Sequence, residues 1–193
     1  MAGEKKILIQ GKRIRLRTAV KDDMKMKVRW YNDPQVNKTL ILPERLELDR
    51  TYRWFEQAEK DSSRRDWVIE TLRGKPIGFV GIKQINTNNR SGLLYIVIGD
   101  KRYWGKGLGF ESELLAVHYA FQKLGLHKVR GSALEINAAS LALMKKVGFK
   151  QEGTLRDEYF KDGRFFDVHI FSILRSEFYR KHPELRRDDA VDR

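Results

Sequence analysis

The first segment of the chain alternates apolar and basic residues. Across Ile7–Arg17 the alternation continues on both sides of Gly11, and residues 13–17 read Arg-Ile-Arg-Leu-Arg. A repeat of two residues is typical of a strand that buries one face. The sequence therefore predicts that the chain begins with a pair of strands.

Two helices are predicted next, over residues 18–31 and 47–60. In the first, Thr18 supplies a capping hydroxyl, and Asp22 and Asp23 fall in the first turn, where the helix dipole favours carboxylates. The second is indicated by apolar residues at helical spacing, namely Leu48, Tyr52, Phe55 and Ala58. The face that these residues form should be buried.

A hairpin and a central strand follow. Residues 66–72 and 77–85 are interpreted as the two strands of the hairpin, because the connecting residues 73–76 contain the Gly and Pro of a turn. Residues 87–92 are polar and predict a loop. Residues 93–98 are almost continuously apolar, which is typical of a strand covered on both faces.

The remaining elements alternate between helix and strand. We predict a helix over 110–124, a strand over 128–134, a short helix over 138–147, and strands over 150–158 and 165–174. Length and apolar content fit a single domain, which we place at residues 1–178. The charged residues 179–193 are expected to form a loosely ordered tail.

The bulk composition narrows the classes of partner. A formal charge of +13 at pH 7 favours an anionic partner such as CoA, a nucleotide or ribosomal RNA, although a heat-adapted surface has a similar composition. The absence of cysteine excludes disulfides, thiolate metal sites and a cysteine nucleophile. Because no apolar run is long enough for a signal peptide or a membrane span, we expect a cytoplasmic protein without membrane contact.

The most informative segment lies between the central strand and the next helix. Its residues are Tyr103, Trp104, Gly105, Lys106, Gly107, Leu108 and Gly109. Glycines let backbone N–H groups approach a ligand closely, and the start of the helix adds the positive end of its dipole. The segment therefore predicts a pyrophosphate site, with a flexible turn as the alternative. Its spacing is neither that of a P-loop nor that of a dinucleotide fingerprint.

A second group of residues lies one strand farther along the chain. Asn137 is a predicted helix cap, Gly148 a helix end, and Phe149 the apolar contact that follows such an end. These local roles leave Ser140 unexplained. Its hydroxyl would share a helix face with Met144.

Together the two motifs resemble those of the GNAT superfamily of acyl-CoA N-acyltransferases. The likeness covers residues 10–178, and the two motifs at this separation are more specific than either motif alone. Residues 32–34 and 153–156, with Gly163 and Asp167, resemble the branch of ribosomal-protein N-terminal acetyltransferases and spermidine acetyltransferases.

The resemblance implies an α/β fold of the α+β kind. Its twisted, mixed and mostly antiparallel sheet would have about seven strands, with about four helices around it. A splayed central pair of strands would form the cleft for CoA.

The resemblance also implies the cofactor contacts. The backbone of Trp104–Gly109 would bind the CoA pyrophosphate, and the central strand would pair with the pantetheine arm as an added strand does. The other implied contacts are Ile96, Val97, Ile98, Asn137, Ser140 and Lys145. Lys106 and Lys145 would be phosphate neighbours, with solvated surface lysines as the alternative description.

The implied chemistry is direct transfer of an acetyl group from acetyl-CoA to a neutral primary amine, without a metal. Val97 N–H is the expected oxyanion donor. The tyrosine that serves many members as the acid corresponds to Met144, so Ser140 remains as the candidate acid. The carboxylate that relatives often carry early in the central strand corresponds to Leu93. The candidates for the missing base are Glu135, Tyr95, Glu111 and a chain of waters.

The amine acceptor is expected to be a protein N-terminal α-amine, as in the ribosomal-protein type, or a small amine. A nucleotide-linked amino sugar or a polyamine is the alternative, and the net charge argues against the polyamine. Four aromatic residues could line the acceptor pocket or belong to the core: Trp30, Tyr31, Trp54 and Phe55.

A ribosome- or nucleic-acid-binding module without catalysis is the alternative of another class. Ten of the first 29 residues are Lys or Arg, as a phosphate-binding surface requires. Ribosome association is therefore possible for an enzyme as well, and the expected assembly is a monomer or a homodimer.

Overall fold

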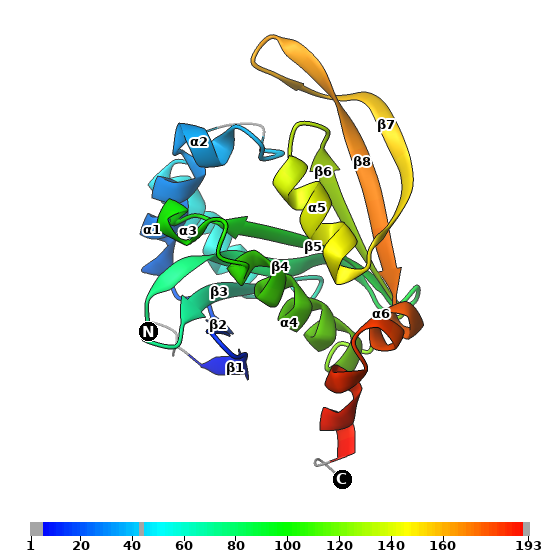
Figure 1. Cartoon of the computed structure of the whole chain (residues 1–193). Helices are drawn as coiled ribbons and strands as arrows, with labels where there is room; N and C mark the ends of the chain where they lie inside the picture. The colour runs from blue at the N-terminus through cyan, green and yellow to red at the C-terminus, as the bar shows by residue number, and fades with distance from the viewer. Residues whose placement is uncertain (1–5, 43–44, 191–193) are drawn as a thin grey trace.

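One sheet organises the molecule (Figure 1). The computed structural model describes residues 6–42 and 45–190. The strands are β1 (Ile7–Gln10), β2 (Ile14–Thr18), β3 (Arg65–Thr71), β4 (Pro76–Asn86), β5 (Ser91–Ile98), β6 (Lys128–Leu134), β7 (Lys150–Lys161) and β8 (Arg164–Leu174). They lie in the order β1-β2-β3-β4-β5-β6-β8-β7. The predicted mixed, mostly antiparallel sheet is confirmed, with eight strands instead of about seven.

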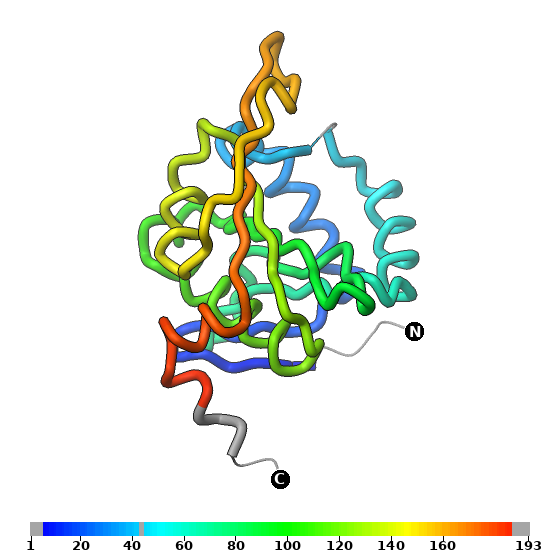
Figure 2. Tube along the Cα trace, turned by 90° about the vertical axis from the view of Figure 1, so that its right-hand side faces the viewer, coloured from blue at the N-terminus to red at the C-terminus, as the bar shows by residue number. Residues whose placement is uncertain are grey.

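Helices cover both faces of the sheet. They are α1 (Asp23–Tyr31), α2 (Pro34–Asn37), α3 (Leu48–Ala58), α4 (Leu108–Gln122), α5 (Ala138–Val147) and α6 (Arg175–Lys181), with 3-10 helices η1 (Lys101–Tyr103) and η2 (Pro183–Ala190). Figure 2 shows α3 (cyan) and α5 (yellow-green) on opposite sides of the sheet. The four predicted helices are present, and the sequence did not predict α2 and α6.

The first helix begins later than predicted. Thr18 pairs with Trp67 at the end of β2, and α1 starts at Asp23. The Asp23 carboxylate accepts hydrogen bonds from Val20 N–H and from both Nη atoms of buried Arg17, at 2.7 to 2.8 Å. Because this carboxylate fixes residues 20–23 as a turn, the strand continues through Thr18 and the helix cannot start there.

Two other predicted boundaries move. The predicted loop 87–92 is shorter, because Ser91 already pairs with Asn86 and β5 begins there. The predicted strand 150–158 continues to Lys161, so that β7 and β8 form one long hairpin.

The segment expected to be a charged tail is helical as far as Ala190. Tyr179 and His182 are buried, and His182 Nε2 donates to Val147 O at 2.8 Å. Residues 191–193 lie outside the described residues. The placement of a single domain at residues 1–178 stays a prediction.

The central strands splay as expected. β5 and β6 are the only parallel neighbours in the described sheet, and they pair only where Ser91–Leu93 meets Lys128–Arg130. Beyond these residues the strands separate. A cluster that includes Val80, Leu94 and Met144 packs around α4 on one face, and a second cluster packs under α1 and α3 on the other. The gap between β5 and β6 connects the two faces.

Candidate active site

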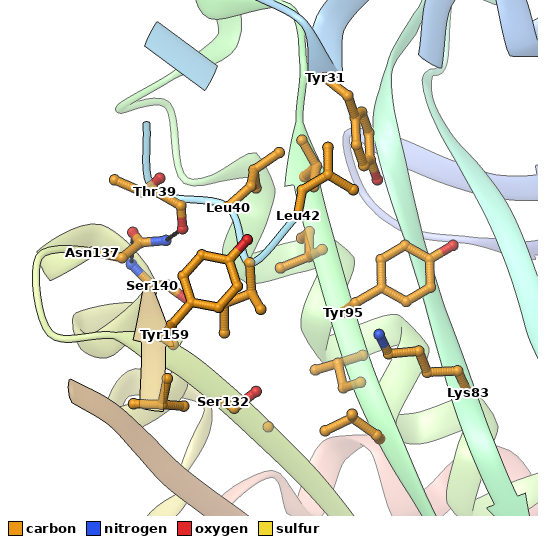
Figure 3. A pocket seen from close by; sticks show the side chains of 18 of the residues that line it. Tyr31, Thr39, Leu40, Leu42, Lys83, Tyr95, Ser132, Asn137, Ser140 and Tyr159 are labelled. Atoms are coloured by element: carbon orange, nitrogen blue, oxygen red, sulfur yellow. Dashed lines mark hydrogen bonds between the residues drawn. The ribbon is translucent and has the colours of Figure 1, made fainter. Parts of the chain in front are cut away.

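A cavity of about 850 Å³ lies where β5 and β6 diverge (Figure 3). Its walls come from β4, β5, β6, β7, β8, α1, α3, α4 and α5, from the residues 39–42 and 45–47, and from Arg64 and Asn137. Figure 3 shows Tyr31, Tyr95 and Lys83 on one side of this space and Thr39, Asn137, Ser140 and Tyr159 on the other.

Successive side chains of β5 point to opposite faces of the sheet, so the cavity has two sides. Tyr95 and Val97 pack with the residues under α1 and α3, whereas Leu94 and Ile96 pack with those around α4. We call the first the α1 side, which holds Lys27, Tyr31, Trp54, Arg64, Lys83 and Tyr95. We call the second the α4 side, which holds Ile96, Glu113, Asn137, Ser140 and Met144.

The glycine segment forms an open bend at the start of α4. Gly105 and Gly107 have φ values of +70° and +74°, in the left-handed region that favours glycine. A Cβ added at Gly105 would meet nothing within 4 Å, and one at Gly107 would meet only the Arg13 guanidinium. The first N–H groups of α4 have no acceptor inside the helix, and no side chain caps them. The Arg13 guanidinium is therefore the one side chain found against these two glycines in the described residues, and the bend can accommodate an anion.

Arg13 and Glu111 brace this bend. The guanidinium of Arg13 donates to Lys106 O at 2.9 Å and to Gly107 O at 3.2 Å. The Glu111 carboxylate accepts from Arg13 N–H at 2.8 Å and from Arg13 Nε at 2.9 Å. Because Glu111 is engaged in this way and does not line the cavity, it does not suit the role of a base.

The free edge of β5 faces the gap. Gly99 N–H donates to Ile77 O, and the indole N–H of Trp104 donates to Ile98 O at 2.7 Å. Successive residues of a strand direct their backbone groups to opposite edges, so the N–H of Val97 points to β4. The N–H of Ile96 points into the gap. Ile96 therefore offers the cavity the backbone donor that we expected from Val97.

Asn137 and Ser140 lie at the start of α5. Asn137 caps the helix, because its Oδ1 accepts from Ser140 N–H at 3.1 Å, and its Nδ2 donates to Thr39 O at 3.3 Å. Ser140 and Met144 line the cavity one helical turn apart. The Ser140 hydroxyl has no hydrogen-bond partner in the described residues.

Of the predicted catalytic and cofactor-binding residues, Ile96, Val97, Asn137 and Ser140 line the cavity, whereas Ile98, the segment Trp104–Gly109, Glu135 and Lys145 do not. Lys106 and Lys145 are exposed on the surface, and Lys106 Nζ is 5.5 Å from the Tyr103 ring centroid. Glu135 is exposed, and its carboxylate accepts from Asp167 N–H at 3.4 Å. Of the four candidate aromatics, Tyr31 and Trp54 line the cavity, whereas Trp30 and Phe55 are buried in the core.

Lys27 is a residue of the α1 side that sequence reasoning missed. It is 8% exposed, and its Nζ lies 3.5 Å from the Trp54 ring centroid. Burial lowers the pKa of Lys27 to about 7. Its spacing from Met24 and Tyr31 was a signal, because three and four residues separate neighbours on one helix face.

The sequence also did not predict that the phenol groups of Tyr95 and Tyr31 are buried. Tyr95 OH donates to the Asp66 carboxylate, and burial raises its pKa well above the ordinary value. Tyr31 OH is buried without a hydrogen-bond partner, and burial likewise raises its pKa. Both phenols are therefore neutral at pH 7, and Tyr95 does not suit the role of a base.

Glu113 is the missed residue of the α4 side. Its side chain is buried within α4 and lines the cavity. Its Oε2 has no hydrogen-bond partner, and burial raises the pKa of the carboxyl to about 8.

No His, Asp or Glu cluster suited to a metal ion occurs in the described residues.

The family model described as acetyltransferase (GNAT) domain matches residues 13–150. Spermidine N(1)-acetyltransferase of Vibrio cholerae is 30% identical over 142 residues, which are 69% of this chain and 80% of that protein. An uncharacterized N-acetyltransferase, p20 of Bacillus licheniformis, is 25% identical over 170 residues, with 86% and 95% covered.

A solved structure of an N-acetyltransferase has the same fold. The crystal structure of the Vibrio cholerae spermidine N-acetyltransferase in complex with CoA and spermine superposes with a TM-score of 0.81 at 27% identity. The match covers 86% of this chain and 97% of that one. None of the helices in the described ranges combines the length and apolar character that a membrane span requires.

Proposed function

The chain belongs to the GNAT family and is an acetyl-CoA-dependent N-acetyltransferase, and we propose that its acceptor is a small primary amine that also carries an anionic group. A nucleotide-linked amino sugar has this chemistry. The observation that carries the proposal is the positive charge of the α1 side.

Five basic and three acidic side chains line the cavity. The basic ones are Lys27, Arg45, Arg50, Arg64 and Lys83, and the acidic ones are Glu47, Glu113 and Glu158. Burial raises the pKa of Glu113 to about 8, so it is neutral at pH 7, and Arg64 pairs with Asp66 at 2.6 Å. Within the described residues, no ion pair joins Lys27 or Lys83 to a carboxylate. Burial lowers the pKa of Lys83 as well, and nearby Arg64 adds to the shift. An anionic group of the acceptor would therefore be attracted here, while a polycation would be repelled.

The remaining geometry supports direct transfer. We place the CoA pyrophosphate at Gly105 and Gly107 and the pantetheine arm along the free edge of β5. The thioester carbonyl then lies in the gap, where Ile96 N–H would stabilise the oxyanion. The acceptor approaches from the α1 side. Most of the rate enhancement would come from holding the two reactants in line.

The acceptor nitrogen must be uncharged to attack. Cations near a bound ammonium disfavour its charged form and lower its pKa. Lys27 and Lys83 would therefore help to keep the amine neutral, so that a dedicated carboxylate base is not required. Glu135, which is exposed and hydrogen-bonded to Asp167 N–H, would not be needed.

A polyamine is the second candidate acceptor, because the relatives support it. One relative named above is the spermidine acetyltransferase of Vibrio cholerae, and the solved structure of a spermidine N-acetyltransferase from the same organism holds CoA and spermine. Glu47 and Glu158 would be the carboxylates available to a polycation. The relatives reported above do not name a protein N-terminus as acceptor, so that expectation and ribosome association stay predictions.

Thiol release from acetyl-CoA tests the acceptor class. The amines are a nucleoside-diphosphate-linked amino sugar, spermidine, a peptide with a free N-terminus and an aminoglycoside, and mass spectrometry identifies each product. We expect the amino sugar to give the highest kcat/KM. A Lys83→Met variant should lower that value by about tenfold, equal to about 1.4 kcal/mol, without lowering the value for spermidine.

Lys25→Met is the matched control, since Lys25 carries the same charge on the exposed face of α1. It should leave all four amines unaffected. A higher kcat/KM for spermidine than for the amino sugar, or an unchanged amino-sugar rate in Lys83→Met, would reject the anionic acceptor.

A further inference from the structure

The burial of the Glu113 carboxyl is not explained by any contact that stabilises the fold in the described part of the chain. Its carboxyl lies on the buried face of α4, 1% exposed, and Oε2 has no hydrogen-bond partner among the described residues. A buried polar group without a partner destabilises the folded state, and most such groups in native proteins are satisfied. A residue that carries this cost at the wall of a reaction cavity is a candidate for a chemical role.

The position of Glu113 places it at the donor end of the cavity. Gly109 lies one turn earlier on the same face of α4, and a Cβ there would lie 3.4 Å from Leu143 of α5. Met144 follows Leu143 and lines the cavity together with Glu113. Glu113 therefore belongs to the α4 side, where the thioester sulfur would sit if the pantetheine arm follows β5.

The reaction needs a proton at that sulfur. A CoA thiolate leaves with a thiol pKa of about 8.5, so an acid of similar strength assists its departure. Met144 cannot donate a proton. The Ser140 hydroxyl is a far weaker acid than a carboxyl.

We infer that the neutral carboxyl of Glu113 is the catalytic acid that protonates the departing sulfur of CoA. This inference rests on the proposed direct transfer from acetyl-CoA. It does not depend on which amine is the acceptor.

The step balances as follows. The amine nitrogen forms a bond to the thioester carbon, and the carbonyl oxygen takes the negative charge. When the oxyanion collapses, the C–S bond breaks and its electron pair stays on sulfur, which receives the Glu113 proton. The nitrogen loses one proton to solvent, and the Glu113 carboxylate regains a proton from solvent before the next turnover.

No neighbouring cation in the described residues is expected to stabilise the charged form of Glu113. Burial is the sole cause of its raised pKa, which lies near 8. Ionisable side chains on the strands and on α5 are directed elsewhere: Arg15 and Arg17 to Glu70, Tyr95 to Asp66, Lys128 to Glu152, Arg130 to Gln84, and Lys83 to the α1 side, while Lys145 and Lys146 are exposed. On α6, which also packs on α4, Glu177 pairs with Lys150, Tyr179 OH contacts His118, Lys181 Nζ donates to Lys145 O, and Arg175 and Arg180 are exposed. The carboxyl therefore stays protonated below about pH 8 and loses its proton above it.

The test compares wild type with Glu113→Gln and Glu113→Leu, using whichever amine the wild type acetylates. Both variants should bind acetyl-CoA as wild type does and lower kcat by about 10- to 100-fold, the lower part of the range for acid catalysis. The wild-type kcat should fall above pH 8, and this alkaline fall should be absent in Glu113→Gln. Glu113→Leu should have a higher Tm than wild type, because it removes an unpartnered carboxyl.

The outcomes separate the two proposals. If wild type releases no thiol with any amine, the proposed function fails before this inference is tested. If wild type is active and Glu113→Gln keeps kcat within threefold and keeps the alkaline fall, the inference is overturned. A Ser140→Ala variant that abolishes the fall, while Glu113→Gln does not, would assign the acid to Ser140 instead.

Discussion

At the scale of single residues, Lys27 combines a cost in stability with a use in binding. Its ammonium is almost fully buried between Trp54 and Phe79, at 3.5 and 5.5 Å from the two ring centroids. The aromatic faces attract the cation, but burial still lowers its pKa to about 7. An anion bound on the α1 side would restore the charge.

The titration of Lys27 predicts a pH dependence of stability. Since its pKa is about 7 in the folded chain and about 10.4 in an unfolded one, the unfolded state binds the extra proton between these pH values. The free energy of unfolding should therefore rise as pH increases from 7 to 10, by on the order of 3 to 4 kcal/mol from this group. Urea unfolding at both pH values measures the rise.

A Lys27→Met variant isolates this contribution. It should be more stable than wild type at pH 7 and should lack the Lys27 part of the rise. Lys25→Met, on the exposed face of the same helix, should behave as wild type. An identical pH dependence in wild type and Lys27→Met would contradict the assignment.

Residue roles could be predicted from the sequence where they are local. The cap at Asn137 and the left-handed Gly148 depend only on the residues of one helix end, and both are present. Lys27 and Glu113 are different, because their burial is produced by elements distant in sequence. A lysine and a glutamate on helices are ordinarily solvated, and only their positions on apolar faces could have identified them.

At the scale of elements, the bend before α4 depends on glycine for two separable reasons. Gly107 has a left-handed backbone, which strains any other residue, and its open face is the proposed phosphate site. Gly125, just beyond the other end of α4, has φ of +64° and nothing within 4 Å of an added Cβ. The two positions therefore share the backbone strain but not the proposed ligand.

Gly107→Ala and Gly125→Ala form a matched pair. Each should lower the free energy of unfolding by about 1 kcal/mol, the usual cost of a left-handed non-glycine residue. Only Gly107→Ala should also weaken acetyl-CoA binding, by about tenfold, because its methyl group covers the bend and disturbs Arg13. Calorimetric titration with acetyl-CoA measures the affinity, and equal affinities in the two variants would refute the placement of the pyrophosphate.

Helices and strands were predicted well where the hydrophobic periodicity agrees with the residues that end an element. The strand 128–134 and the helix 138–147 match β6 and α5 to the residue, because Gly and Asn mark their ends. The start of α1 was wrong because the Asp23 carboxylate binds Arg17 of the preceding strand. α6 was missed because its sequence is mostly charged, while Phe178 and Tyr179 pack on Phe121 of α4.

At the scale of the whole molecule, one contact joins the outer hairpin to the cavity. Figure 1 shows the β7–β8 hairpin projecting beyond the rest of the sheet. Near its tip, Lys161 Nζ donates to Asn37 O at 2.6 Å, to Asn37 Oδ1 at 2.9 Å and to Leu40 O at 3.2 Å. Leu40, Ile41 and Leu42 line the cavity. Lys161 therefore holds a cavity wall in place from a distant part of the chain.

Replacing Lys161 should make that wall more mobile without affecting the proposed CoA-binding residues. In Lys161→Met the carbonyls of Asn37 and Leu40 lose their donor, so amide hydrogen exchange at residues 37–42 should become faster. The KM for the acceptor should rise by about three- to tenfold, since binding would have to order the segment again, while acetyl-CoA affinity stays unchanged. Lys150→Met is the control, because Lys150 pairs with Glu177 at the other end of β7. Unchanged exchange at 37–42, or an equal rise in KM in Lys150→Met, would show that the hairpin does not support the acceptor site.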